Sequence, residues 1–197
     1  MNEQSIRIRR ALISVSDKRG LLELGRALAD NDVEIMSTGG SARVLRENGI
    51  PVVEVSDFTG FPEIMGGRIK TLHPRVHAGI LARAGIDDES AREHDLPSID
   101  LVVVNLYPFA ETVARPDCSL DEAIDNIDIG GPAMLRAAAK NHARVTVVCA
   151  PDDYPRLIEN LPAAPDNAAR FALATSAFAH TASYDGQISQ WLSRRVD

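Results

Sequence analysis

The fold is decided by residues 10–55, RALISVSDKRGLLELGRALADNDVEIMSTGGSARVLRENGIPVVEV, in which short apolar runs alternate with helical patterns. Apolar runs of strand length occupy residues 10–15, 33–36 and 52–55. Strands that alternate with helices over such short links are typical of βαβ units. We therefore expect an α/β fold with a Rossmann-like parallel sheet and helices on both faces.

Two helices are expected between these strands. Leucines at positions 21, 24 and 28 recur at helical spacing after the first strand. After the second strand, Ser41 is expected to cap a helix that runs to Asn48, and Gly49 is expected to close it.

The rest of the chain continues the pattern after a looser stretch from residue 56 to 96, a length typical of functional or mobile loops. Residues 99–104 and 145–149 are further strand candidates, and Ser119 begins a capping-box spacing before another helix. We expect one domain over residues 1–197, with 151–197 as a helical C-terminal appendage. Its expected packing stripe is Phe171, Ala174, Phe178, Ala182, Ile188 and Trp191.

Composition limits the classes of function. A formal charge of −7 disfavours a general nucleic-acid binder or a binder of anionic membranes. No apolar run approaches the length of a membrane span, and residues 1–10 lack the apolar core of a signal peptide. The two cysteines, Cys118 and Cys149, suit a reducing compartment better than a disulfide framework. We expect a cytoplasmic protein.

Two polar segments that follow strands suggest a phosphate site. Residues 14–18, SVSDK, offer hydroxyls, a helix start and a cation, and residues 38–41, TGGS, offer close backbone approach before a second helix. Each segment alone is more typical of an ordinary polar turn, but together they indicate a phosphorylated ligand. Neither has the glycine spacing of a Walker or dinucleotide motif, which disfavours nucleoside triphosphates and NAD.

Residues 128–141, DIGGPAMLRAAAKN, combine a glycine pair with the start of a helix. Gly130 and Gly131 are expected to adopt backbone angles barred to other residues, and Pro132 suits the first helical position. Asp128 would then be a proton acceptor beside free amide donors that stabilise negative charge. The alternative is a strand-to-helix turn with a surface aspartate.

Three further side chains are candidates for the same site. If residues 66–74 are extended, Arg68 and Lys70 share one side and present two cations to an anionic substrate. Tyr107 follows a strand, where its hydroxyl could relay protons. His73 and His77 have the spacing of a helical metal pair, but Pro74 disfavours helical geometry at His73. We therefore expect no metal.

Six ordered motifs carry a resemblance to a known family. They are SVSDK at 14–18, GFPE at 60–63, GRIKTLHP at 67–74, NLYPF at 105–109, DIGG at 128–131 and RAAAKNH at 136–142. Together with FAHTASYD at 178–185, they resemble the inosine monophosphate (IMP) cyclohydrolase domain of the bifunctional purine-biosynthesis protein. The resemblance implies a methylglyoxal-synthase-like fold and the closure of 5-formamidoimidazole-4-carboxamide ribotide to IMP, without a cofactor.

The resemblance also implies a set of site residues. Around the phosphate and ribose it places Ser14, Ser16, Asp17, Lys18, Thr38, Gly39, Gly40 and Ser41. Along the base it places Arg68, Ile69, Lys70, Thr71, Val104, Asn105, Asp128, Ile129, Gly130 and Gly131. For the chemistry we expect Asp128 as proton acceptor, Gly130 and Gly131 as oxyanion donors, and Lys70, Tyr107 and Lys140 in proton transfer. A regular helix rises about 12 Å from Pro132 to Lys140, which separates Lys140 from Asp128 unless the helix bends, the lysine reaches back or a dimer forms.

The family's usual partner domain is a folate-dependent transformylase, which this sequence does not contain before it ends at Asp197. We expect a free-standing cyclohydrolase or an excised domain, a homodimer, and a separate transformylase as partner. Two alternatives stay open, a non-catalytic phosphate-ligand module and a methylglyoxal-synthase-type lyase of the same fold.

Overall fold

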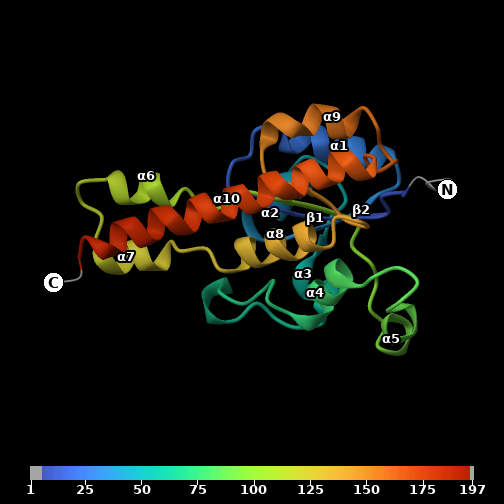
Figure 1. The fold of residues 1–197 in the computed structure, drawn as a ribbon, viewed down its shortest axis with the longest axis horizontal. Coiled ribbons are helices and arrows are strands. Elements are labelled where there is room, and N and C mark those ends of the chain that lie inside the picture. The colour runs from blue at the N-terminus through green and yellow to red at the C-terminus, as the bar shows by residue number, and fades with distance from the viewer. Residues whose placement is uncertain (1–5, 196–197) are drawn as a thin grey trace.

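Parallel strands form a five-stranded sheet in the order β3-β2-β1-β4-β5 in the computed structural model, which describes residues 6–195 (Figure 1). The strands are β1 Arg10–Ser14, β2 Glu34–Ser37, β3 Val53–Glu54, β4 Leu101–Val104 and β5 Thr146–Val148. All four pairings are parallel, which confirms the expected sheet. The third strand is shorter than expected because Val55 already begins a helix.

Helices connect and cover these strands. They are α1 Leu21–Asp30, α2 Gly39–Glu47, α3 Val55–Thr59, α4 Pro74–Leu81, α5 Asp88–Glu93, α6 Phe109–Ala114, α7 Leu120–Asp125, α8 Gly130–Lys140, α9 Tyr154–Ile158 and α10 Asn167–Ser193. Short 3-10 turns occupy Met65–Gly67 and Pro151–Asp153. No helix within residues 6–195 is long and apolar enough to cross a membrane.

The core has two layers, one on each face of the sheet. Leu101 and Val103 of β4 pack in the cluster formed with α1, α2 and α9, whereas Val102 and Val104 pack in the cluster formed with α4, α8 and α10. Figure 1 shows α1 and α9 side by side on one side of the molecule. This alternation along a strand buried on both faces confirms the prediction of helices on both sides of the sheet.

The C-terminal helix α10 packs along α8 and beside β5. The predicted stripe was correct at Ala174, which is 3% exposed, and wrong at Phe171, Phe178 and Ala182, which are exposed. Besides Ala174, the buried side is formed by Arg170, Ala177, Thr181 and Tyr184. Ile188 and Trp191 do pack against the core, as expected.

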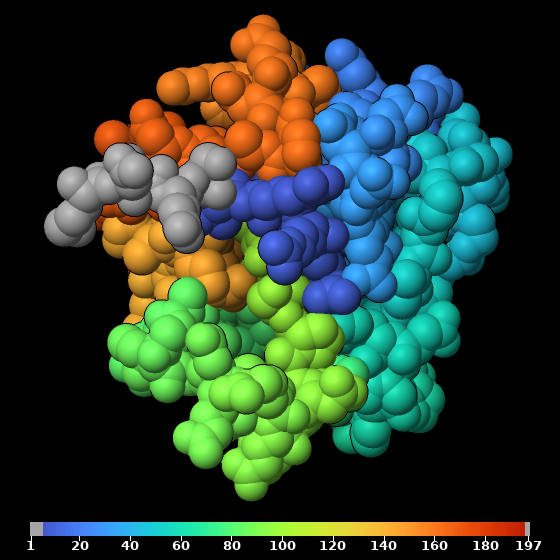
Figure 2. Space-filling model, turned by 90° about the vertical axis from the view of Figure 1, so that its right-hand side faces the viewer, coloured from blue at the N-terminus to red at the C-terminus, as the bar shows by residue number. Residues whose placement is uncertain are grey.

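The chain before β1 is held at the amino ends of the strands. Ile8 N–H donates to the Pro162 carbonyl at 2.8 Å, and Ala164 N–H donates to the Ile6 carbonyl at 2.7 Å. Figure 2 shows this segment, in dark blue, beside the orange C-terminal segment that contains α9.

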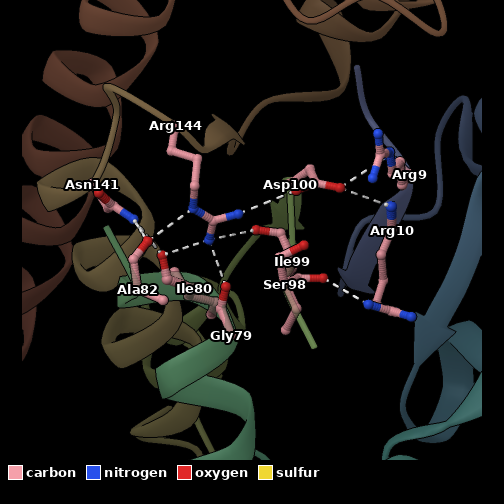
Figure 3. Close-up of polar contacts among 10 residues, drawn as sticks. All are labelled: Arg9, Arg10, Gly79, Ile80, Ala82, Ser98, Ile99, Asp100, Asn141 and Arg144. Atoms are coloured by element: carbon pink, nitrogen blue, oxygen red, sulfur yellow. Dashed lines mark hydrogen bonds and ion pairs between the residues drawn. The ribbon is translucent and has the colours of Figure 1, made fainter. Parts of the chain in front are cut away.

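A buried network joins this segment to β4 and α4 (Figure 3). The Arg144 guanidinium donates to Asp100 Oδ1 at 3.1 Å and to the Ala82 carbonyl at 2.9 Å. Asp100 Oδ2 accepts from the backbone N–H groups of Arg9 and Arg10 at 2.9 and 3.2 Å. Because it lies at the amino ends of the strands, this network is on the edge of the sheet opposite the polar strand ends.

Candidate active site

A cavity of about 540 Å³ lies where β1, β2 and β4 end. Ligands of open parallel sheets bind at this edge, because the connecting loops and helix N-termini gather there. Its wall contains most of the predicted site residues, namely Ser14, Ser16, Thr38, Gly39, Gly40, Ser41, Arg68, Lys70, Thr71, Asn105, Tyr107, Asp128, Ile129, Gly130 and Gly131.

Five predicted site residues are not part of this wall: Asp17, Lys18, Ile69, Val104 and Lys140. Val104 is a buried residue of β4, and Asp17 forms an ion pair with Arg19 on the surface. Ile69 lies in a turn after Met65–Gly67. Their roles toward a ligand stay predictions.

One end of the cavity is formed by the N-terminus of α2. This helix begins at Gly39 with Thr38 as N-cap, so Ser41 is not the cap that we expected. Gly39 and Gly40 are its first residues, and their N–H groups have no acceptor within the helix. The hydroxyls of Ser14 and Thr38 are 3.1 Å apart at the same place. Amide donors, hydroxyls and the helix dipole together suit a phosphate.

Ser41 and Lys18 instead hold this end of the site together. Ser41 Oγ accepts from Val15 N–H at 3.0 Å and from Lys18 Nζ at 3.0 Å. Lys18 also donates to the Val15 carbonyl. Burial and, next, the nearby charge of Arg43 lower the pKa of Lys18. Lys18 therefore ties β1 to α2, with its Nζ 3.9 Å from the point that a Cβ on Gly40 would occupy.

Asn105 positions the loop after β1. Its Oδ1 accepts from the N–H groups of Ser16 and Asp17 at 2.6 and 2.9 Å, and its Nδ2 donates to the Asp17 carbonyl at 3.2 Å. Because these two amides are engaged, the hydroxyl of Ser16 is the group that this loop can offer to a ligand.

The other end of the cavity is formed by Asp128 and the start of α8. Asp128 N–H donates to the Tyr184 hydroxyl at 2.8 Å, and Asp128 Oδ1 accepts from Gly131 N–H at 2.9 Å. Burial raises the pKa of the Asp128 carboxyl, although Gly131 N–H and the Lys70 charge act in the opposite direction. A carboxylate that gains a proton readily is suited to act as a base.

Glycine is needed at positions 130 and 131 for a different physical reason from the one that we expected. Gly130 and Gly131 are not among the residues with positive φ, and Pro132 is the third residue of α8. A Cβ on Gly130 would lie 2.4 Å from Thr71 Oγ1, and one on Gly131 would lie 2.4 Å from Asp128 Oδ2. Glycine is therefore needed at both positions because side chains of neighbouring residues approach the backbone closely. Since Gly131 N–H is engaged by Asp128, only Gly130 remains as an oxyanion donor.

The basic segment is not extended, which corrects the premise for Arg68 and Lys70. Both lie in consecutive turns that follow Ile64. Arg68 forms an ion pair with Asp125 from the end of α7, and Lys70 Nζ lies 3.5 Å from Glu63 Oε1. Each cation thus has a carboxylate partner at the edge of the cavity.

Tyr107 is half exposed on the cavity wall, with its ring available to a ligand. Lys140 is elsewhere. It ends α8, and it lines a second cavity of about 600 Å³ together with Phe171 and Phe178. The structure of a single chain does not bring Lys140 to Asp128.

Sequence reasoning missed several wall residues and the residues that support them. Asp125, Asn126, Gly66, Gly67 and Met134 line the cavity, Glu63 pairs with Lys70, and Tyr184 supports Asp128 from α10. The motif GFPE contained Glu63 without indicating its partner. Tyr184 is 56 residues from Asp128, so no local pattern could have paired them.

His73 is the N-cap of α4, where its Nδ1 accepts from Arg75 N–H at 3.1 Å. Pro74 is the first residue of the helix, so His73 lies outside it, as expected. In the described part of the chain, no group of three or more His, Cys, Asp or Glu side chains is arranged to hold a metal ion.

Comparison with known proteins gives two family matches and a similar structure. The family model described as "MGS-like domain" matches residues 20–133, and the one described as "AICARFT/IMPCHase bienzyme" matches residues 138–197. A solved structure titled "Crystal structure of ForH" is 36% identical, with a TM-score of 0.81 over 92% of this chain and 97% of that chain.

Proposed function

The chain belongs to the family of MGS-like domains, and from this membership we propose that it is an IMP cyclohydrolase of purine biosynthesis. The proposed reaction closes 5-formamidoimidazole-4-carboxamide ribotide to IMP with loss of water. One observation carries the proposal. A helix N-terminus suited to a phosphate and a partly buried carboxyl of raised pKa, that of Asp128, face the same cavity.

In the proposed binding mode, the 5′-phosphate of the ribotide lies at the N-terminus of α2. Gly39 and Gly40 N–H groups and the Ser14, Ser16 and Thr38 hydroxyls are the donors at that end. The imidazole then extends toward Asp128, with Thr71 and Ile129 on the cavity wall.

Ring closure needs a better nucleophile than a neutral carboxamide nitrogen. We propose that Asp128 accepts a proton from this nitrogen as the nitrogen attacks the formyl carbon and forms the new C–N bond. The formyl oxygen becomes an oxyanion, which Gly130 N–H and the Lys70 ammonium stabilise. Lys70 or Tyr107 protonates this oxygen to a hydroxyl, and the proton that Asp128 accepted lets it leave as water when the C–O bond breaks. The remaining proton of the former formamide nitrogen returns to Lys70 or Tyr107 as the C=N bond forms.

We propose a cytoplasmic homodimer of single-domain chains that works with a separate transformylase, the source of the formamido substrate. The proposal includes no cofactor.

The test is conversion of the formamido ribotide to IMP by the purified chain, beside a buffer blank and the Asp128→Asn variant. We expect IMP formation well above the blank and a large loss in the variant. A folded protein that binds IMP without forming it would contradict the enzyme and favour a binding module. Product formation from a triose phosphate would instead indicate a methylglyoxal-synthase-type lyase.

A further inference from the structure

Lys70 stands between the two ends of the cavity. Its Nζ lies 3.5 Å from the point that a Cβ on Gly39 would occupy, at the start of α2. Its charge also acts on the carboxyl of Asp128, at the start of α8. One ammonium is therefore within reach of both the phosphate end and the base end.

The surroundings of Lys70 carry charge of both signs. The N-termini of α2 and α8 both line the cavity, and each carries about half a positive charge. Asp128 is partly buried, and this burial disfavours its charged form, whereas the Lys70 charge favours it. Glu63 is the carboxylate in contact with Lys70, with its Oε1 3.5 Å from Lys70 Nζ.

The chain keeps space open for this ion pair at Gly67. A Cβ on Gly67 would lie 2.3 Å from Glu63 Oε1 and 3.2 Å from Lys70 Nζ. Gly67 also has a φ of +84°, which side-chain-bearing residues rarely adopt. Backbone conformation and free space both require glycine at the point where Glu63 meets Lys70.

The ion pair between Glu63 and Lys70 is weak enough for an anionic ligand to displace Glu63. Its 3.5 Å separation exceeds the roughly 2.8 Å of a strong charge-assisted hydrogen bond, and the Glu63 side chain is 48% exposed while that of Lys70 is 25% exposed. An anionic ligand at the α2 N-terminus would compete with Glu63 for the same ammonium.

We propose that Glu63 is a positioning residue that sets where the Lys70 ammonium stands and competes with the phosphate of the ligand for it. With Glu63 in place, the ammonium stays between the two ends, where it serves ring closure. Without Glu63, the ammonium follows the phosphate, so binding tightens and turnover falls. The expected change in turnover rests on the proposed function, whereas the expected change in ligand binding does not.

The binding test compares wild type with Glu63→Gln by calorimetric titration with IMP and with inorganic phosphate. We expect the variant to bind both about threefold to tenfold more tightly, because a competing anion has been removed. The matched control is Glu54→Gln. Glu54 lines the same small hollow beside Lys70, but its carboxylate pairs with Arg46 at 2.7 Å, so binding of both anions should not change.

The kinetic test separates positioning from a structural role. We expect Glu63→Gln to lower both KM and kcat, with kcat falling about tenfold, and Glu63→Asp to recover part of kcat. A purely structural role would instead raise KM and lower Tm. Unchanged or weaker IMP binding in Glu63→Gln would overturn the inference. If wild type forms no IMP, the proposed reaction fails, and the binding titrations still decide the role of Glu63.

Discussion

At the residue scale, Asp128 links catalysis to stability. Its carboxyl is buried beside α8, and this burial raises its pKa above the usual 3.8. A raised pKa in the folded state means that the carboxyl favours folding most when it is protonated. This contribution is lost as the pH rises through the folded-state pKa.

Replacing Asp128 with Asn should therefore remove activity and leave the fold intact. We expect kcat to fall by about 10² to 10⁴, the usual contribution of a general base. The free energy of unfolding, measured by urea titration, should exceed that of wild type at pH 7 and match it below the usual carboxyl pKa. A variant that is less stable than wild type at pH 7 would contradict this account of Asp128.

The glycines of α8 give a second prediction at this scale. In Gly131→Ala, the new methyl group would lie 2.4 Å from Asp128 Oδ2 and 2.7 Å from Leu106 Cδ2. We expect a loss of about 1–3 kcal/mol in unfolding free energy and a fall in activity, since both neighbours must move.

The control for Gly131 is Gly186→Ala, in the middle of α10. A Cβ there would meet nothing within 4 Å. Alanine favours helices over glycine by about 1 kcal/mol, so this variant should be more stable than wild type. If Gly131→Ala raises Tm, as Gly186→Ala should, close packing at Gly131 is not the reason for its glycine.

At the scale of elements, Arg144 joins pieces of chain that are distant in sequence. Its guanidinium donates to carbonyls of Gly79, Ile80 and Ala82 at the end of α4 and pairs with Asp100 before β4. Burial lowers the pKa of Arg144, and the Asp100 carboxylate opposes this shift. The network fixes how α4 meets the sheet.

Arg144→Ala should destabilise the protein by about 3–5 kcal/mol, because it leaves the buried Asp100 carboxylate without its cation, although Asn141 Nδ2 still donates to the Ile80 and Ala82 carbonyls. Chemical denaturation measures this loss. Arg83→Ala, which removes an exposed pair with Asp87, is the control and should cost far less, because water and salt screen exposed pairs. Equal losses in the two variants would show that the Arg144 network adds nothing beyond a surface pair. The network lies opposite the cavity, so kcat of folded Arg144→Ala should stay near that of wild type.

At the scale of the whole molecule, the position of Lys140 poses a question of assembly. The resemblance assigns Lys140 to the active site, yet one chain places it in the second cavity, at the other end of α8 from Asp128. In the proposed homodimer, a partner copy is the remaining source of this lysine.

Mixing two inactive variants tests this arrangement. If each site takes Asp128 from one copy and Lys140 from the other, a heterodimer of Asp128→Asn and Lys140→Ala contains one intact site. Random exchange of equal amounts should therefore restore about a quarter of wild-type activity. A Lys140→Ala variant that is fully active alone, or a mixture with no recovery, would remove Lys140 from the catalytic set.

The sequence by itself determined the sheet, its helices and the edge that carries the site, because hydrophobic periodicity and strand ends are local properties. Residues 14–18 and 38–41 follow β1 and β2 at this edge for that reason, whereas residues 128–131 follow α7 and were grouped with them by the family resemblance. Tertiary structure decided what those residues do. Close approach, not unusual backbone angles, requires Gly130 and Gly131; Tyr184 reaches Asp128 from a distant helix; and Glu63 meets Lys70 over Gly67. These features depend on distances between segments far apart in the chain, and only the folded structure fixes those distances.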